Sequence, residues 1–266
     1  MGLLNLFKKK NANIPTQASS QNESGKEPYY GDLKKTDILH RLVRVPKEDR
    51  NEEWQQRFLE NVSEASFRCG EPQVIVGPDG FPYFQLFLPE PNKAFQCFVI
   101  SHLKNDCLLD AGIGVVINPG SEDADWVFSY GDILNFHLNQ TFYTNEGSLF
   151  SKKTESEVLS VAEEVLVAQP SEKLLPDFVR KLLADFLKRN GINKPRIALM
   201  MRNQEDEIGV TQDLVFNVTQ ADFQNEDTYH YVMQAIAWHL PRHYSFIGLD
   251  EKILGDGFAS LYKNPE

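Results

Sequence analysis

Two histidines of this chain have a spacing that occurs in metal sites. His239-Leu-Pro-Arg-His243 places two imidazoles at i and i+4, on one side of a helix if the helix is unbroken. Pro241 disfavours helical angles at the residue before it, and Leu240 stands where the metalloprotease motif has its glutamate. We therefore predict capping and packing roles for this pair, and no metal ligand.

The other candidate groups for catalysis also lack a complete arrangement. Cys97 lies near His102 in the sequence and Cys107 near Asp110, yet nothing around either thiol favours the thiolate that a nucleophile requires. Gly112-Ile-Gly114 leads into a strand rather than a helix, so a bulge or a close approach of strands explains its glycines better than a phosphate-binding loop does. We predict no catalytic residue, no cofactor-binding residue and no cofactor.

Aromatic and acidic residues supply the candidate contact surface. Ser121–Asp125 and Glu205–Glu207 are acidic loops without the alternating oxygens and central glycine of a calcium loop, so they fit solvated turns or docking sites for a basic partner. Aromatic residues are dense near position 130, where they fit either an interface or a sheet core. The predicted interaction surface comprises Trp126, Phe128, Tyr130, Asp123, Asp125, Glu205, Asp206 and Glu207.

Net charge restricts the classes of partner. The formal net charge is −11 at pH 7, with 27 basic and 38 acidic residues. Residues 1–30 hold four lysines and two glutamates, a balance of +2, so the remaining residues carry −13. Because such a surface repels phosphate backbones, we predict no nucleic-acid binding. A basic protein partner, or simple solubility, explains the acidic balance.

Cysteine use and hydropathy indicate the compartment. Three cysteines without C-x-x-C spacing make neither a zinc site nor a disulfide framework, and they are typical of a reducing cytosol. No apolar run approaches the ~18 residues that cross a bilayer. Leu3, Leu4, Leu6 and Phe7, followed by three lysines, leave open a weak contact with a membrane surface, although so short a segment buries too little to hold alone. We predict a cytoplasmic protein.

The pattern of elements predicts an α+β fold with two domains. Residues 1–35 form a predicted disordered tail, 36–143 an N-terminal domain with a helix on an antiparallel sheet, and 144–157 a polar linker. In order, the pattern predicts a helix at 46–68, strands at 73–76, 83–88, 95–101 and 113–117, a turn at 104–106, an apolar element at 126–130, and a strand or helix at 131–138.

The second domain, residues 158–266, has the alternation of an α/β domain with two helices packed on a sheet. Apolar residues recur at i, i+3 and i+4 from Leu175 to Leu187, which predicts an amphipathic helix. The continuous apolar run 196–201 is typical of a strand buried on both faces. The remaining predicted elements are strands at 165–169, 214–218 and 245–249 and a helix at 225–240.

Four segments of the second half resemble a known family. They are Val165–Arg180, Arg196–Met201, the helix ending at Leu240, and Ala259–Lys263. A valine-rich strand ending in Gln-Pro, a helix, an apolar strand and a late Tyr-Lys are similar to the C-terminal domain of the SseB (enhanced serine sensitivity) family, over about residues 158–263. The resemblance implies a cytosolic bacterial protein, and it transfers no catalytic motif to this chain.

Three functional hypotheses follow from these features. The leading one is a non-enzymatic interaction or regulatory protein, whose contact surface is the groove between the domains or an exposed aromatic sheet face. The first alternative is a hydrolase or transferase that uses His102, His137 or His239 with a nearby carboxylate. The second alternative is an immunity-type protein whose acidic surface neutralises a basic toxin.

Overall fold

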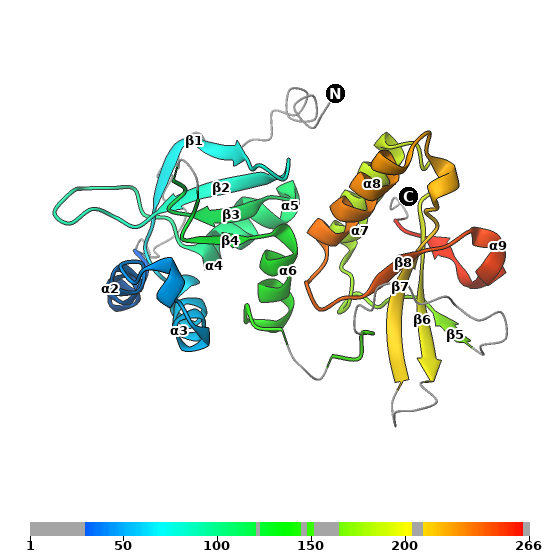
Figure 1. Ribbon diagram of the computed structural model, residues 1–266, viewed down its shortest axis with the longest axis horizontal. Helices are drawn as coiled ribbons and strands as arrows, with labels where there is room; N and C mark the ends of the chain where they lie inside the picture. The colour runs from blue at the N-terminus through cyan, green and yellow to red at the C-terminus, as the bar shows by residue number, and fades with distance from the viewer. Residues whose placement is uncertain (1–29, 121–122, 145–147, 152–164, 204–209, 263–266) are drawn as a thin grey trace, which may run out of the picture. The chain divides into compact units, whose positions relative to one another are not determined.

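The computed structural model describes residues 30–120, 123–144, 148–151, 165–203 and 210–262 (Figure 1). The chain divides into two compact units, Met1–His137 and Leu138–Glu266. Each unit holds helices and one mixed sheet, so the predicted α+β class is confirmed. The division falls near the end of helix α6 (Tyr130–Asn139), ahead of the polar segment 144–157.

Two capped helices begin the described part of the first unit. In α2 (Leu33–Leu42) the Asp32 carboxylate accepts hydrogen bonds from two backbone N–H groups of the first turn, and in α3 (Glu52–Val62) Asn51 does the same for one. Helix α2 therefore starts inside the segment 1–35 for which we predicted disorder. The predicted helix 46–68 is too long, because Asn51 caps α3 and a strand begins at Arg68.

The sheet of the first unit has the order β1-β2-β3-β4. Strands β1 (Arg68–Val76) and β2 (Pro82–Phe87), which include most of the predicted strands 73–76 and 83–88, pair as an antiparallel hairpin. Strand β3 (Gly114–Ile117) is parallel to β2, and β4 (Trp126–Phe128) is antiparallel to β3. The sheet is therefore mixed, and the prediction of an antiparallel sheet was wrong for the β2–β3 pair.

A helical segment that the sequence pattern did not predict connects the two parallel strands β2 and β3. It runs through α4 (Ile100–Leu103), a π-helical turn (Lys104–Leu108) and α5 (Leu109–Ala111), and it crosses from β2 to β3. Parallel neighbours require such a crossover connection. The predicted strand 95–101 was wrong, because Phe98 forms an isolated β-bridge with Phe67 and a helix begins at Ile100. The predicted turn 104–106 was also wrong, because these residues belong to the π-helical turn, which breaks the 3.6-residue spacing of the apolar side chains. Gly112, with φ of 69°, ends the segment in the left-handed region, so it is a helix cap rather than a strand bulge.

Aromatic side chains fill the space between α3 and this sheet. Trp54 and Phe58 of α3 stack at 5.1 Å between ring centroids, and Trp126 of β4 lies 5.8 Å and 5.3 Å from them. Phe128 continues the cluster at 6.1 Å from Trp126. Phe58 and Phe128 are almost fully buried, so this cluster is the core that joins α3 to the sheet.

The second unit has the sheet order β5-β6-β7-β8, with β9 paired to β6. Its strands are β5 (Val165–Ala168), β6 (Arg196–Asn203), β7 (Val210–Phe216), β8 (Phe246–Gly248) and β9 (Ala259–Ser260). Its helices are α7 (Asp177–Arg189), α8 (Glu226–His239) and the short α9 (Glu251–Leu254). The predicted strands and both long helices of this half are confirmed.

Both faces of β6 and β7 are covered, as the apolar run 196–201 predicts. Figure 1 shows α7 and α8 along one face and α9 near the other. On the α9 side, Ala198, Met200, Val215 and Phe258 form a buried cluster. Phe150 forms a bridge beside β7 at Gln212 and is buried, so residues 148–151, which lie inside the predicted linker, pack against this sheet.

The two units share one local topology. In the first, the antiparallel β1–β2 hairpin is followed by a helical crossover and the parallel strand β3. In the second, the antiparallel pair β6–β7 is followed by α8 and the parallel strand β8. The sequence shows no internal repeat, so the two units are similar in the order and direction of their strands and not in their residues.

Candidate functional site

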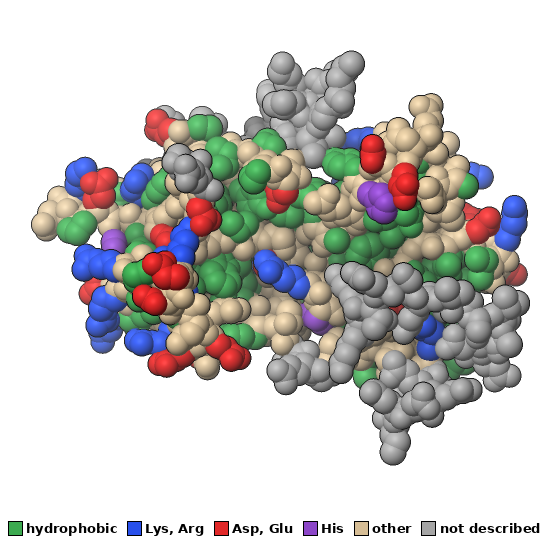
Figure 2. Space-filling view, in the orientation of Figure 1, with side chains coloured by type: hydrophobic (Ala, Val, Ile, Leu, Met, Phe, Trp, Pro, Cys, Tyr) green, Lys and Arg blue, Asp and Glu red, His purple; other side chains and the backbone are tan. Residues whose placement is uncertain are grey.

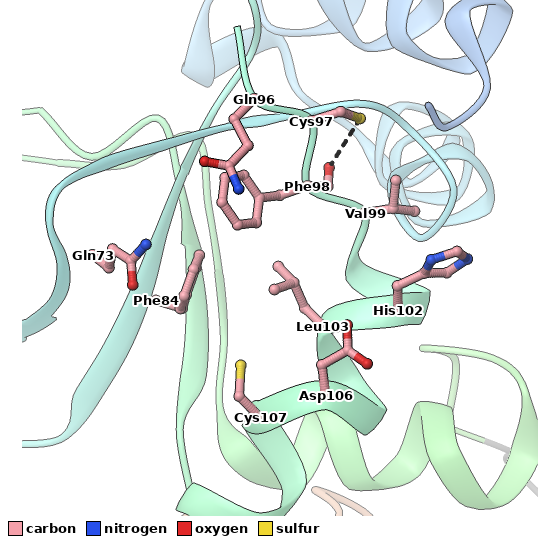
Figure 3. A pocket seen from close by; sticks show the side chains of 10 residues that line it. All are labelled: Gln73, Phe84, Gln96, Cys97, Phe98, Val99, His102, Leu103, Asp106 and Cys107. Atoms are coloured by element: carbon pink, nitrogen blue, oxygen red, sulfur yellow. Dashed lines mark hydrogen bonds between the residues drawn. The ribbon is translucent and has the colours of Figure 1, made fainter. Parts of the chain in front are cut away.

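A small cavity in the first unit lies between the β1–β2 hairpin and the helical crossover (Figure 3). Its volume is about 180 Å³. Side chains from β1, from β2, from the loop before α4, from α4 and from the π-helical turn surround it. The lining residues are Gln73, Phe84, Gln96, Cys97, Phe98, Val99, His102, Leu103, Asp106 and Cys107.

The cavity has an apolar floor and a polar rim. Phe84, Val99 and Leu103 are buried, and the Phe98 ring lies 5.9 Å from that of Phe84. Gln96 and Asp106 are exposed, and Gln73 is partly exposed. In Figure 3 the carboxamides of Gln73 and Gln96 are directed toward the space above Phe84 and Leu103. Apolar walls with a few converging polar groups are typical of binding sites.

Backbone irregularities bring these polar groups to the rim. The register of β1 against β2 shifts between Cys69 and Val74, and Gln73 lies within this shift. Gln85 of β2 donates a 2.5 Å hydrogen bond to the carbonyl of Pro72, which fixes the irregular segment. Asp106 and Cys107 come from the π-helical turn. Bulges and π-helical turns both re-aim side chains, and both are frequent at functional sites.

The thiols of the cavity are protonated at neutral pH. Burial, with the Asp106 carboxylate beside it, raises the pKa of the Cys107 thiol to about 11. Burial also raises the pKa of the Cys97 thiol, whose Sγ donates a 3.0 Å hydrogen bond to the Tyr30 carbonyl. A thiolate is the nucleophilic form, so these two side chains serve as weakly polar lining rather than as activated nucleophiles.

The three histidines of the enzyme hypothesis lie in different places. His102 lines the cavity, but Figure 3 shows its ring turned outward, away from Asp106. His137 is in α6, where burial and the charge of Lys104 lower its pKa. His239 ends α8 in the second unit, and its Nδ1–H donates a 2.7 Å hydrogen bond to the carbonyl of Ala235. The structure therefore brings one of the three to the cavity.

The predicted interaction surface is corrected for two of its aromatic residues. Phe128 and Tyr130 are buried, and the Tyr130 hydroxyl donates to the carbonyl of Leu109. Trp126 is partly exposed and belongs to the cluster with Trp54. These side chains fill the sheet core, where their large apolar area stabilises the fold, and Phe128 and Tyr130 are inaccessible to a partner.

The two predicted aspartates near β4 form ion pairs within the unit. Asp123 is exposed and pairs with Lys47. Asp125 is mostly buried and accepts a 2.7 Å hydrogen bond from Nη2 of Arg50 and a 2.8 Å bond from Asn118. Asp125 therefore has a structural role, while Asp123 stays accessible. Glu205, Asp206 and Glu207 lie outside the described residues.

Helix α8 ends before Pro241, as the sequence predicts. The helix ends at His239, and Leu240 has extended backbone angles ahead of Pro241. Among the described residues, no group of three or more histidines, cysteines and carboxylates is placed to hold a metal ion. Among the described helices, none has the length and hydropathy of a membrane span.

Charges on the face shown in Figure 2 are mixed. Lysine and arginine side chains lie beside aspartate and glutamate side chains over α2 and α3. The sequence singled out Cys97, His102 and Cys107, but it gave no signal for Gln73 or Gln96, because glutamine has no motif of its own.

Comparison with protein-family models, curated proteins and solved structures found no match.

Proposed function

We propose that this chain is a non-enzymatic, cytoplasmic protein-interaction module, and that the cavity of the first unit anchors a side chain of its partner. The observation that carries the proposal is an apolar floor beneath three polar side chains that have no hydrogen bond to any described residue. Those side chains are Gln73, Gln96 and Asp106. Their hydrogen-bonding capacity is available to a partner.

The size of the cavity supports an anchoring role. Pockets that enclose a drug-sized molecule measure roughly 300–1,000 Å³, whereas a cavity of roughly 150 Å³ holds one benzene ring. At about 180 Å³ this cavity suits one large side chain. Side chains that fill such pockets supply much of the binding energy of protein interfaces.

Closing the cavity tests the proposal. Gln96→Trp places an indole at the rim, and Ala94→Trp adds the same group to the same loop at an exposed residue that does not line the cavity. Proteins bound by each tagged full-length variant in a lysate of the source cell are quantified by mass spectrometry. We expect specific partners to be retained by wild type and Ala94→Trp and lost with Gln96→Trp. Equal binding by all three contradicts the proposal.

The acidic balance favours a second candidate, an immunity-type protein that binds a basic toxin. Outside residues 1–30 the chain carries −13, which speeds association with a cationic protein. A gene for a basic toxin beside the gene for this chain, and survival of cells that express both, would support it. The resemblance to the SseB family stays a prediction, and it is compatible with either binding function.

A further inference from the structure

We infer that the side chain anchored in the cavity is an arginine of a protein partner. This inference rests on the proposed function and names the chemistry that the cavity recognises. The one formal charge among the ten lining residues is the carboxylate of Asp106, since none of the ten is lysine or arginine. The cavity is therefore electrostatically matched to a cation.

Unused hydrogen-bond acceptors point to a guanidinium group. Asp106 offers two carboxylate oxygens, and the carboxamides of Gln73 and Gln96 each offer one carbonyl oxygen. None of these three side chains bonds to a described residue. A guanidinium has five N–H donors in a planar fork, whereas an ammonium has three on one atom. Arginine therefore has enough donors for a carboxylate and a carboxamide.

The floor of the cavity matches the stem of the same side chain. Arginine buries its methylene groups against apolar surface while its charged head stays near water. Phe84, Val99 and Leu103 supply that surface, and the charged residue Asp106 stands at the exposed rim. The ring of Phe98 lies beside the cavity, and arginine stacks on aromatic faces more often than lysine does.

A leucine or phenylalanine side chain fits the floor less completely. Such a side chain would cover Asp106 and the two carboxamides without giving them donors, and a polar group that loses water without a partner destabilises a complex. A neutral polar side chain would satisfy the carboxamides and leave the carboxylate uncompensated. The positive charge that compensates the carboxylate of Asp106 therefore distinguishes arginine from apolar and neutral side chains.

The test uses small probes and the 15N-labelled full-length chain. The probes are the Nα-acetyl methylamides of arginine, lysine, citrulline and leucine, where citrulline has nearly the shape of arginine without its charge. The signals of the Gln73 and Gln96 side-chain amides report binding. We expect the arginine probe to shift both signals with a dissociation constant on the order of millimolar, and citrulline to bind about tenfold more weakly.

Two matched variants locate the charge. Asp106→Asn keeps the shape of the rim and removes its carboxylate, and we expect about tenfold weaker binding of the arginine probe. Asp110→Asn makes the same change one turn further along the segment, at an exposed residue that does not line the cavity, and we expect no change. Unaltered backbone signals elsewhere in the spectrum show that both variants are folded.

The outcomes separate this inference from the proposed function. Binding of leucine or citrulline as strong as that of arginine, or an unchanged constant in Asp106→Asn, overturns the arginine assignment. If partner proteins are then still lost with Gln96→Trp, the anchoring function stands without it. If no probe shifts the two glutamine signals and Gln96→Trp still binds partners, both the inference and the proposed function are wrong.

Discussion

At the scale of single residues, side chains of the same chemical type differ in pKa and in their contribution to stability because their surroundings differ. Cys107 shows this for thiols, because burial and the adjacent Asp106 hold its pKa near 11 rather than near the ~8.5 of free cysteine. We expect alkylation of Cys107 by iodoacetamide at pH 8 to be at least about 100-fold slower than that of an unstructured cysteine peptide, with a rate that rises about tenfold per pH unit up to pH 10. Peptide mapping by mass spectrometry measures it, and a rate equal to the peptide's would contradict the buried environment.

Two neighbouring cations, Arg50 and Lys47, differ in the same way. The Arg50 guanidinium contacts the carbonyls of Val43 and Val45 and the carboxylate of Asp125, and it lies 4.6 Å from the Trp54 ring centre. Removing the guanidinium leaves the carboxylate of Asp125, which is mostly buried, without its counter-charge. We expect Arg50→Ala to lower the free energy of unfolding by about 3–5 kcal/mol in urea titrations.

The exposed pair of Lys47 and Asp123 supplies the control for that measurement. Solvent screens both charges, so Lys47→Ala should leave the unfolding midpoint nearly unchanged. Arg50→Lys should fall between the two alanine variants, because an ammonium keeps the charge and loses the planar fork. Equal midpoints for Arg50→Ala and Lys47→Ala would show that the Arg50 network contributes nothing to stability.

His239 gives the second unit a dependence on pH. Burial lowers the pKa of His239 to about 4, while an unfolded histidine titrates near 6.5. The unfolded chain therefore binds the proton first, so stability is complete above pH 6.5 and falls as the pH drops from 6.5 toward 4. We expect His239 to account for about 2 kcal/mol of the stability lost between pH 7.5 and pH 5.

Comparison of two variants isolates this contribution from other titrating groups. His239→Gln keeps an N–H donor for the Ala235 carbonyl and removes the titrating ring. The exposed His230 provides the control substitution, His230→Gln. The pH-dependent loss of stability should shrink in the first variant and persist in the second, and the reverse result would place the effect elsewhere.

At the scale of elements, close backbone approach fixes where β8 lies. A Cβ atom on Gly248 would come within 2.1 Å of the Val218 carbonyl oxygen, which is backbone and cannot turn aside. Gly248→Ala should therefore shift the β8 segment and lower the unfolding midpoint strongly. Gly191→Ala is the matched control, since its Cβ would meet no atom within 4 Å and the cost there comes from a φ of 99° alone. A smaller effect at Gly248 than at Gly191 would contradict the close approach.

Elements with a simple period were the predictable part of the fold. The amphipathic spacing of 175–187 and the apolar run 196–201 correspond to α7 and β6. The first signal arises because one face of a helix is buried, and the second because both faces of a strand are buried. The local sequence records each of these directly. The segment 100–111 was predicted incorrectly because its π-helical turn has no fixed period, and the cavity is built on that segment.

At the scale of the whole molecule, net charge bears on how partners arrive. The acidic balance acts over about 10 Å at 0.1 M salt, while contacts inside a pocket are screened less. If the partner is basic, its association rate with the full-length chain should fall several-fold between low and high salt, with a smaller change in the dissociation rate. Stopped-flow or surface binding kinetics measure both rates, and a salt-independent association rate would argue against electrostatic steering.

The sequence alone determined the α+β class, the two-part organisation and most elements of the second half, because these depend on local periodicity and composition. It also predicted the end of α8 ahead of Pro241, a constraint confined to adjacent residues. Only the tertiary structure decided that Phe128 and Tyr130 are core and that Gln73, Gln96 and Asp106 meet at one cavity. That convergence depends on a strand irregularity and a crossover helix more than twenty residues apart, and no local pattern encodes such a meeting.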